Sequence, residues 1–134
     1  MAYLDFNRTL RGISKVDNAA KLHTNAVDVL SKSLAELKEM LKTPTDQTIF
    51  DTWHEETCAK LIAVYEGSYT VYGGQAQKWV NMTLKYVYTL GDERISGFKA
   101  AYPLCHAPLD NIVVKELVKF GFPGLTDVVW SKLD

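Results

Sequence analysis

Apolar residues recur every three or four positions over residues 19–42, and this spacing constrains the fold more than any other feature of the chain. The stripe consists of Leu22, Ala26, Leu30, Leu34, Leu37 and Leu41. Apolar groups at this period share one face of an amphipathic helix, and that face has to be buried against other elements. Asp17 or Asn18 can cap its start. Pro44 marks its end, because the residue before a proline disfavours the helical conformation.

A second helix is predicted from a cap at Asp46 to about Glu66, where Gly67 and Ser68 close it. We expect its inner face to consist of Ile49, Trp53, Leu61, Ile62 and Tyr65. Residues 69–72 are β-prone, but no other segment is a clear strand with which they could pair. We therefore expect an extended connector there.

A third helix is predicted over residues 75–90, ended by Gly91. One face is apolar and consists of Ala76, Val80, Leu84 and Val87. A polar stripe occupies nearly the opposite face at helical spacing and consists of Gln75, Lys78, Asn81 and Lys85. After a loop that includes Pro103, a short helix is predicted from about Asp110 to Phe120, ended by glycines and a proline.

The whole pattern predicts an all-α fold, an irregular bundle of four to five helices in a single domain over residues 1–134. No repeat, low-complexity tract or Pro/Gly-rich linker divides the chain. The hydrophobic and charged fractions, 47% and 23%, are those of a globular protein. The sequence contains no apolar run of membrane-spanning length and no secretory leader pattern, and its two cysteines lack a CxxC spacing. These features predict a cytoplasmic protein with free thiols and no membrane partner.

Charge and motifs count against several classes of function. The net charge of −1 gives no overall cationic footprint for nucleic acid, whose binding energy comes largely from phosphate neutralisation. The chain also lacks a Gly-rich phosphate loop, a Ser-His-Asp order and an HExxH helix, so the corresponding nucleotide-binding and hydrolytic sites find no support.

Two segments, GGQAQKWVNMTLKY and HAPLDNIVV, carry a family resemblance. They resemble the catalytic stretches of the helix-hairpin-helix DNA glycosylase superfamily, most closely its archaeal 8-oxoguanine glycosylase branch and bacterial relatives, over about residues 73–120. In that superfamily a lysine near a helix start and an aspartate in a P-[VIL]-D arrangement form the active site. These are Lys78 and, 32 residues later, Asp110. The chain has no L-P-G-x-G hairpin turn and no four-cysteine iron–sulfur motif.

The resemblance implies excision of a damaged purine, such as oxidised guanine, from DNA without a metal or other cofactor. Lys78 would attack C1′ to form a Schiff base, and the Asp110 carboxylate would stabilise the positive charge that builds on the deoxyribose. Among the polar side chains, Gln75, Asn81 and Lys85 are expected to face the substrate, with His106 at the edge of the site. We also expect the starts of the two helices to converge on one concave surface.

Other interpretations stay open at this point. Lys78 also suits a solvated helix position and Asp110 an ordinary helix cap. The alternative function is a catalytically silent helical module that binds a protein partner or itself, since the near-neutral chain is rich in Trp and Tyr. A zinc site would need four ligands, His54, Cys58, Cys105 and His106, whose spacing is not paired in both halves, so no metal is expected.

Overall fold

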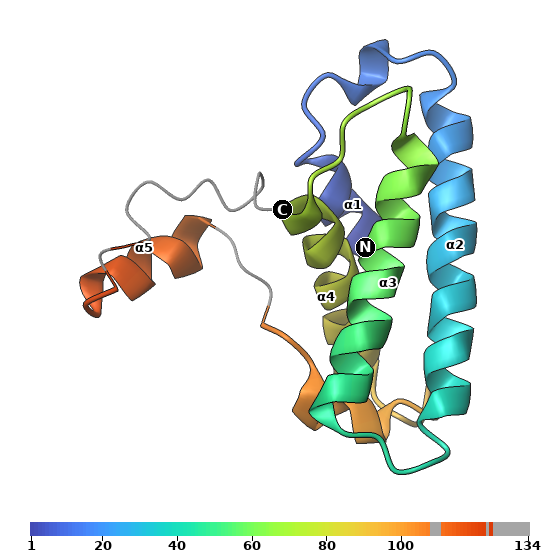
Figure 1. Cartoon of the computed structure of the whole chain (residues 1–134), viewed down its shortest axis with the longest axis vertical. Helices are drawn as coiled ribbons and strands as arrows, with labels where there is room; N and C mark the ends of the chain where they lie inside the picture. The colour runs from blue at the N-terminus through green and yellow to red at the C-terminus, as the bar shows by residue number, and fades with distance from the viewer. Residues whose placement is uncertain (108–110, 123, 125–134) are drawn as a thin grey trace.

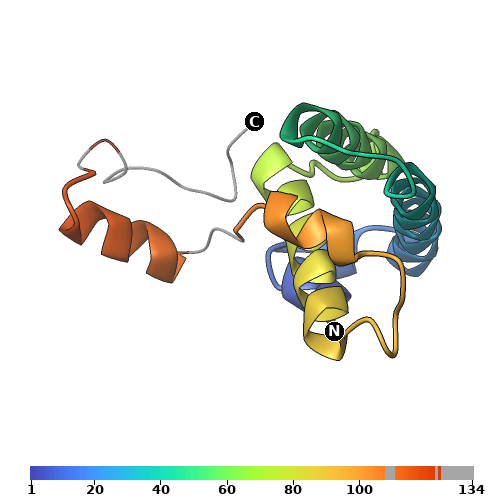
Figure 2. The same cartoon turned by 90° about the horizontal axis from the view of Figure 1, so that it is seen from below.

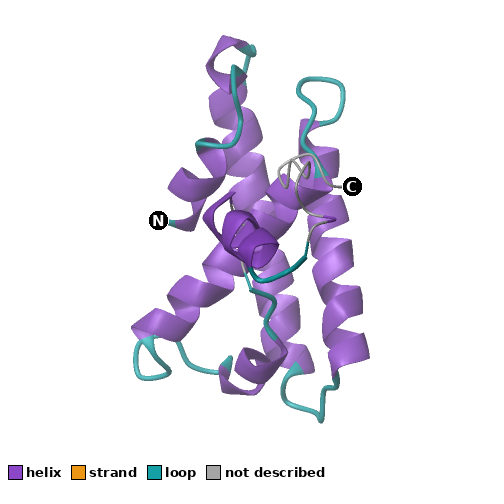
Figure 3. Cartoon of the chain, turned by 90° about the vertical axis from the view of Figure 1, so that its left-hand side faces the viewer, coloured by secondary structure: helices purple, strands orange, loops and turns teal. Residues whose placement is uncertain are grey.

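The computed structural model describes residues 1–107, 111–122 and 124, and every regular element in this part of the chain is a helix (Figure 3). The all-α prediction is confirmed: the fold is a small helical bundle. In chain order the elements are α1 (Ala2–Asn7), the 3₁₀ helix η1 (Ile13–Lys15), α2 (Ala19–Met40), α3 (Gln47–Tyr65), α4 (Gly73–Leu90), the 3₁₀ helix η2 (Lys99–Leu104) and α5 (Asn111–Lys119).

The helix boundaries follow from local chemistry. Asp46 caps α3, and its Oδ1 accepts a hydrogen bond from the backbone N–H of Ile49 at 2.9 Å. Asn18 takes the cap position of α2 in a left-handed conformation, without a side-chain cap bond. Gly91 ends α4 with φ at 79°, a conformation that glycine adopts without steric cost. Residues 69–72 form the expected extended connector.

The bundle is built on α4, which packs against α1 and α3, while α2 packs on the other side of α3 (Figure 1). α1 and η1 were not predicted, because six residues are too few to show a helical period. Phe6 explains why α1 nevertheless forms: its ring is fully buried and stacks on the indole of Trp79, with centroids 4.3 Å apart. Tertiary packing of this kind supports helices too short to be stable alone.

The apolar faces predicted for α2 and α4 are confirmed, and that of α3 is wrong at one position. Ala26, Leu30 and Leu37 of α2 are buried, as are all four apolar residues of α4. On α3 the core residue of the first turn is Phe50, which is fully buried, whereas Ile49 is 44% exposed. Position 50 is three and four residues before the buried Trp53 and His54 and therefore lies on the face of both, whereas position 49 is four residues before Trp53 only and lies at the edge of the buried face.

Residues 91–107 contain η2, where the sequence predicted only a loop. η2 lies against the first part of α3 and against α4, as the view from below shows (Figure 2). The Nε2–H of Gln47 fixes this position by donating to the carbonyl oxygen of Leu104 at 3.0 Å. α5 stands apart from the other helices (Figures 1 and 2). None of the described helices is long and apolar enough to cross a membrane.

The Phe6–Trp79 stack generates a stability prediction. The substitution Phe6→Ala removes a fully buried ring and should lower the free energy of unfolding by about 3–5 kcal/mol. Denaturant unfolding followed by circular dichroism measures this change. Leu4→Ala is the matched control in the same helix, because Leu4 is 53% exposed and its loss should change stability by less than about 0.5 kcal/mol. Equal effects of the two substitutions would contradict the packing described for α1.

Candidate functional site

The structure disperses the polar stripe of α4. Gln75 is buried, and both ends of its amide are engaged: Oε1 accepts from the Tyr72 backbone N–H at 3.0 Å, and Nε2–H donates to the Thr9 carbonyl at 2.8 Å. These bonds tie the start of α4 to the segment after α1. Gln75 therefore stabilises the fold and is not among the residues around the cavity described below.

Lys78 is half-buried and lies one helical turn before Asn81 on the same side of α4. Asp110 lies outside the described residues. The expected convergence of Lys78 and Asp110 on one surface therefore stays a prediction.

Three of the predicted substrate contacts meet at one cavity of about 400 Å³. Asn81 and Lys85 come from α4, and His106 follows η2. The described residues that line it are Asn81, Leu84, Lys85, Tyr88, Tyr102, Cys105 and His106. The rings of Tyr88 and Tyr102 meet edge to face with centroids 4.9 Å apart, so the cavity has an aromatic wall beside its polar groups.

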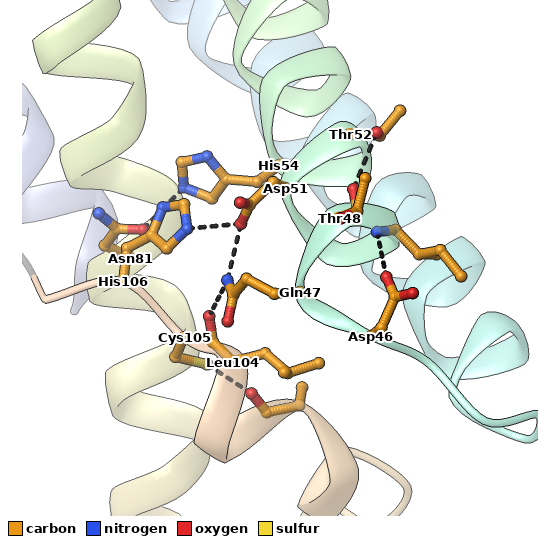
Figure 4. Close-up of polar contacts among 12 residues, drawn as sticks. Asp46, Gln47, Thr48, Asp51, Thr52, His54, Asn81, Leu104, Cys105 and His106 are labelled. Atoms are coloured by element: carbon orange, nitrogen blue, oxygen red, sulfur yellow. Dashed lines mark hydrogen bonds and ion pairs between the residues drawn. The ribbon is translucent and has the colours of Figure 1, made fainter.

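An aspartate from α3 holds the imidazole of His106. Asp51 Oδ1 accepts from His106 Nε2 at 2.8 Å and from Gln47 Nε2–H at 2.7 Å (Figure 4). The hydrogen bond from Gln47, and then that from His106, hold the pKa of Asp51 below its ordinary value. The ionised carboxylate only accepts hydrogen bonds, so the Nε2 of His106 carries a proton.

A second histidine joins α3 to α4 beneath the cavity. His54 is 2% exposed, its Nε2 lies 2.8 Å from Asn81 Oδ1, and its Nδ1 lies 3.9 Å from Cys58 Sγ. The imidazole rings of His54 and His106 are neighbours (Figure 4), and their centroids are 4.5 Å apart. Burial lowers the pKa of His54 and raises that of the Cys58 thiol to about 12. At neutral pH the thiol therefore donates to Nδ1, and the neutral ring donates its Nε2–H to Asn81.

The four residues considered for zinc do not form a metal site in the structure. His54, Cys58 and His106 are neighbours, but Cys105 Sγ donates to the Ala101 carbonyl at 3.3 Å. Burial raises the pKa of Cys105 as well. Within the described ranges, no group of three or more His, Cys, Asp or Glu side chains is arranged to hold a metal ion.

Sequence reasoning missed Asp51 and Tyr102 at this site. Asp51 bonds to a residue 55 positions away, and Tyr102 lies in a segment that was predicted to be a loop. The only available signal was the spacing of His54 and Cys58, which share one face of α3. That spacing correctly indicated that the His54 and Cys58 side chains are neighbours, although they form a hydrogen bond and not a metal site.

No family model, curated protein or solved structure matches this chain. The chemistry of the site is therefore what indicates a function for this chain.

The buried His54 predicts a specific pH dependence of stability. Its pKa is lower in the folded state than the ordinary value of 6.5, so only the unfolded state takes up a proton just below pH 6.5. The contribution of the neutral His54 to the free energy of unfolding is thus complete above that pH and is lost as the pH falls toward the folded pKa. The free energy of unfolding then changes by at most about 1.4 kcal/mol per pH unit.

Denaturant unfolding between pH 7.5 and pH 5 tests this slope against His54→Gln, which has no titrating ring. The wild-type chain should lose stability more steeply than the variant over this range. The pKa of His23 is also lowered by burial, but His23 is present in both proteins and cancels in the difference. Parallel pH profiles would show that His54 does not titrate as described.

Proposed function

We propose that this chain is a DNA glycosylase-like protein that accepts a damaged purine in the cavity beside α4. One observation carries the proposal: Asn81, Lys85 and His106, which the sequence marked for substrate contact, border the same cavity. Lys78 and Asp110 are the reacting pair in this proposal, because they match the lysine and aspartate of the superfamily that the two segments resemble.

The chemistry of the cavity supports an extruded base as its occupant. Its volume of about 400 Å³ falls within the ~300–1,000 Å³ typical of small-molecule sites. Leu84, Tyr88 and Tyr102 provide an apolar and aromatic wall for a planar ring. The amide of Asn81 and the ammonium of Lys85 can then orient the polar edge of that ring, as enzymes that flip bases commonly do.

The proposed reaction begins on the same side of α4. The Nζ of Lys78 attacks C1′ of the damaged nucleotide, the glycosidic bond breaks, and the base leaves with the bonding electrons and gains a proton. The Asp110 carboxylate stabilises the positive charge on the sugar while this bond breaks. Opening of the sugar ring and loss of a proton from the nitrogen of Lys78 give the Schiff base.

Borohydride trapping tests this proposal, because reduction makes the Schiff base permanent. With a duplex that contains 8-oxoguanine, the wild-type chain should form a covalent adduct and Lys78→Gln should form none. Lys32→Gln, on the exposed side of α2, is the matched control and should trap as wild type does. Failure of the wild-type chain to trap either the lesion duplex or an abasic duplex would rule out the lysine chemistry.

Asp110→Asn separates the two proposed roles. An abasic site already presents an aldehyde, so Lys78 can trap it without help from a carboxylate. The variant should therefore retain trapping on the abasic duplex and lose at least about tenfold in base release from the lesion duplex. Equal release by the variant and the wild-type chain would remove Asp110 from the mechanism.

A second candidate, a helical module that binds another copy of itself, is favoured by two aromatic side chains that follow α5. Phe120 is 80% exposed and Phe122 is 58% exposed, just after a helix that stands apart from the bundle (Figure 1). The net charge of −1 offers little repulsion between copies. Exposed aromatic residues are enriched where proteins associate.

Light scattering distinguishes this module from a monomeric enzyme. Under this candidate the wild-type chain is a dimer at micromolar concentration, and Phe120→Ser shifts it toward the monomer. Leu90→Ser, at a 45% exposed position at the end of α4, should leave the mass unchanged. A monomeric wild-type chain over the whole concentration range would exclude self-association.

A further inference from the structure

The cavity holds an imidazole whose orientation is fixed by its neighbours. Asp51 and Gln47 form a hydrogen-bonded pair on α3, and the carboxylate of Asp51 engages the Nε2 of His106. In the neutral ring the proton is therefore on Nε2, and Nδ1 carries a lone pair. No hydrogen bond from a described residue occupies Nδ1. Because His106 lines the cavity, its side chain being 38% exposed, Nδ1 is an acceptor available to a ligand.

The other polar groups of the cavity have the opposite character. The Oδ1 of Asn81 is occupied by His54 Nε2–H, so its two amide N–H donors remain for a ligand. Tyr102 contributes its ring to the lining, because its hydroxyl oxygen is buried from solvent and does not face a ligand in the cavity. Lys85 adds an ammonium group. Several donors thus accompany one acceptor.

We propose that the cavity selects bases with a lactam edge and that His106 recognises this edge. A lactam edge is a ring N–H beside a carbonyl oxygen. The His106 Nδ1 accepts the ring N–H, while the amide of Asn81 donates to the carbonyl oxygen. The rings of His54 and His106 are 4.5 Å apart and His54 bonds to Asn81, so the acceptor and one donor are adjacent (Figure 4).

This inference rests on the proposed function and narrows its substrate class. Keto bases such as hypoxanthine and guanine derivatives present a lactam edge. Adenine presents an amino group where the lactam has its carbonyl oxygen, and this group would meet the amide donors of Asn81. A buried donor left without an acceptor carries a desolvation cost, so the cavity should reject amino bases.

Asp51 is a positioning residue in this arrangement, because it acts through His106 and is not among the residues that line the cavity. Without its carboxylate, the His106 proton can move to Nδ1, which would turn the acceptor into a donor. The effect of Asp51→Asn should therefore appear in the tautomer of His106. A merely structural role of Asp51 would not change that tautomer.

Nucleoside titration of the full chain, followed by isothermal calorimetry, tests the selection. Deoxyinosine carries the lactam edge, deoxyadenosine carries the amino group, and purine deoxyriboside carries neither. The wild-type chain should bind deoxyinosine at least about tenfold more tightly than the other two nucleosides. Equal affinities, or no binding of any of the three at millimolar concentration, would overturn the proposal.

Two variants locate the source of the selection. His106→Phe retains a ring without an acceptor and should abolish the preference for deoxyinosine. Asp51→Asn should reduce it, and the ¹⁵N shifts of His106 should change from the pure Nε2–H tautomer to a mixture. Circular dichroism shows whether each variant is folded. A folded His106→Phe chain with an undiminished preference, or unchanged ¹⁵N shifts in Asp51→Asn, would overturn the assigned roles.

The result separates this inference from the glycosylase chemistry. Nucleoside binding needs neither Lys78 nor a DNA strand. If the chain forms borohydride adducts but shows no lactam preference, the proposed role of His106 is wrong and the lysine chemistry is retained. A lactam preference without adducts would leave a base-binding site and remove the proposed reaction.

Discussion

The hydrogen bond between His54 and Asn81 constrains the rest of the structure more than any other polar contact. Both side chains are almost completely buried, one on α3 and one on α4, and an unpaired polar group at either position would carry a large desolvation cost. The bond therefore restricts the rotation of each helix about its axis. Apolar packing alone tolerates several such rotations, because hydrophobic contacts are not directional. Once α3 and α4 are aligned in this way, Asp51 and Lys85 fall beside the segment that carries His106.

The sequence could predict the long helices because their signals are local. The period of the apolar residues located α2 and α4, and a short polar residue before the helix located the start of α3. α1 could not be found in this way, because it is six residues long and depends on a tryptophan more than 70 positions away. The error at Ile49 has a related cause. In a first helical turn, two adjacent apolar residues fit the period almost equally, and tertiary packing selected Phe50.

The residues of the candidate site also divide into those that local sequence patterns could indicate and those that they could not. Asn81, Lys85 and His106 could be chosen from sequence because they belong to polar positions on one helix and to a short motif. Gln75 satisfied the same pattern, but its contact with Thr9 spans 66 positions and leaves no trace in local spacing. Asp51 and Tyr102 were missed for the same reason, since their roles arise only when η2 reaches the start of α3. The helices were thus predictable because their signals are local. The wall of the cavity was not predictable, because it is formed by residues that are far apart in the sequence.

The donors and acceptors at the cavity are set by the contacts between α3, α4 and the segment after η2. The net charge of −1 gives the chain no overall cationic footprint for phosphate, so the proposed recognition of a base depends on these groups. Two chains of hydrogen bonds end at the cavity, and one leaves donors there while the other leaves an acceptor. In the first, the Cys58 thiol donates to His54 and His54 donates to Asn81, which leaves amide donors at the cavity. In the second, Asp51 takes the proton-bearing side of His106, which leaves an acceptor.

Each chain of hydrogen bonds starts from a group whose protonation state its surroundings maintain, a buried thiol in one and a hydrogen-bonded carboxylate in the other. The pattern of donors and acceptors is therefore built into the α3–α4 interface before any ligand binds, and this preorganisation lowers the cost of recognition.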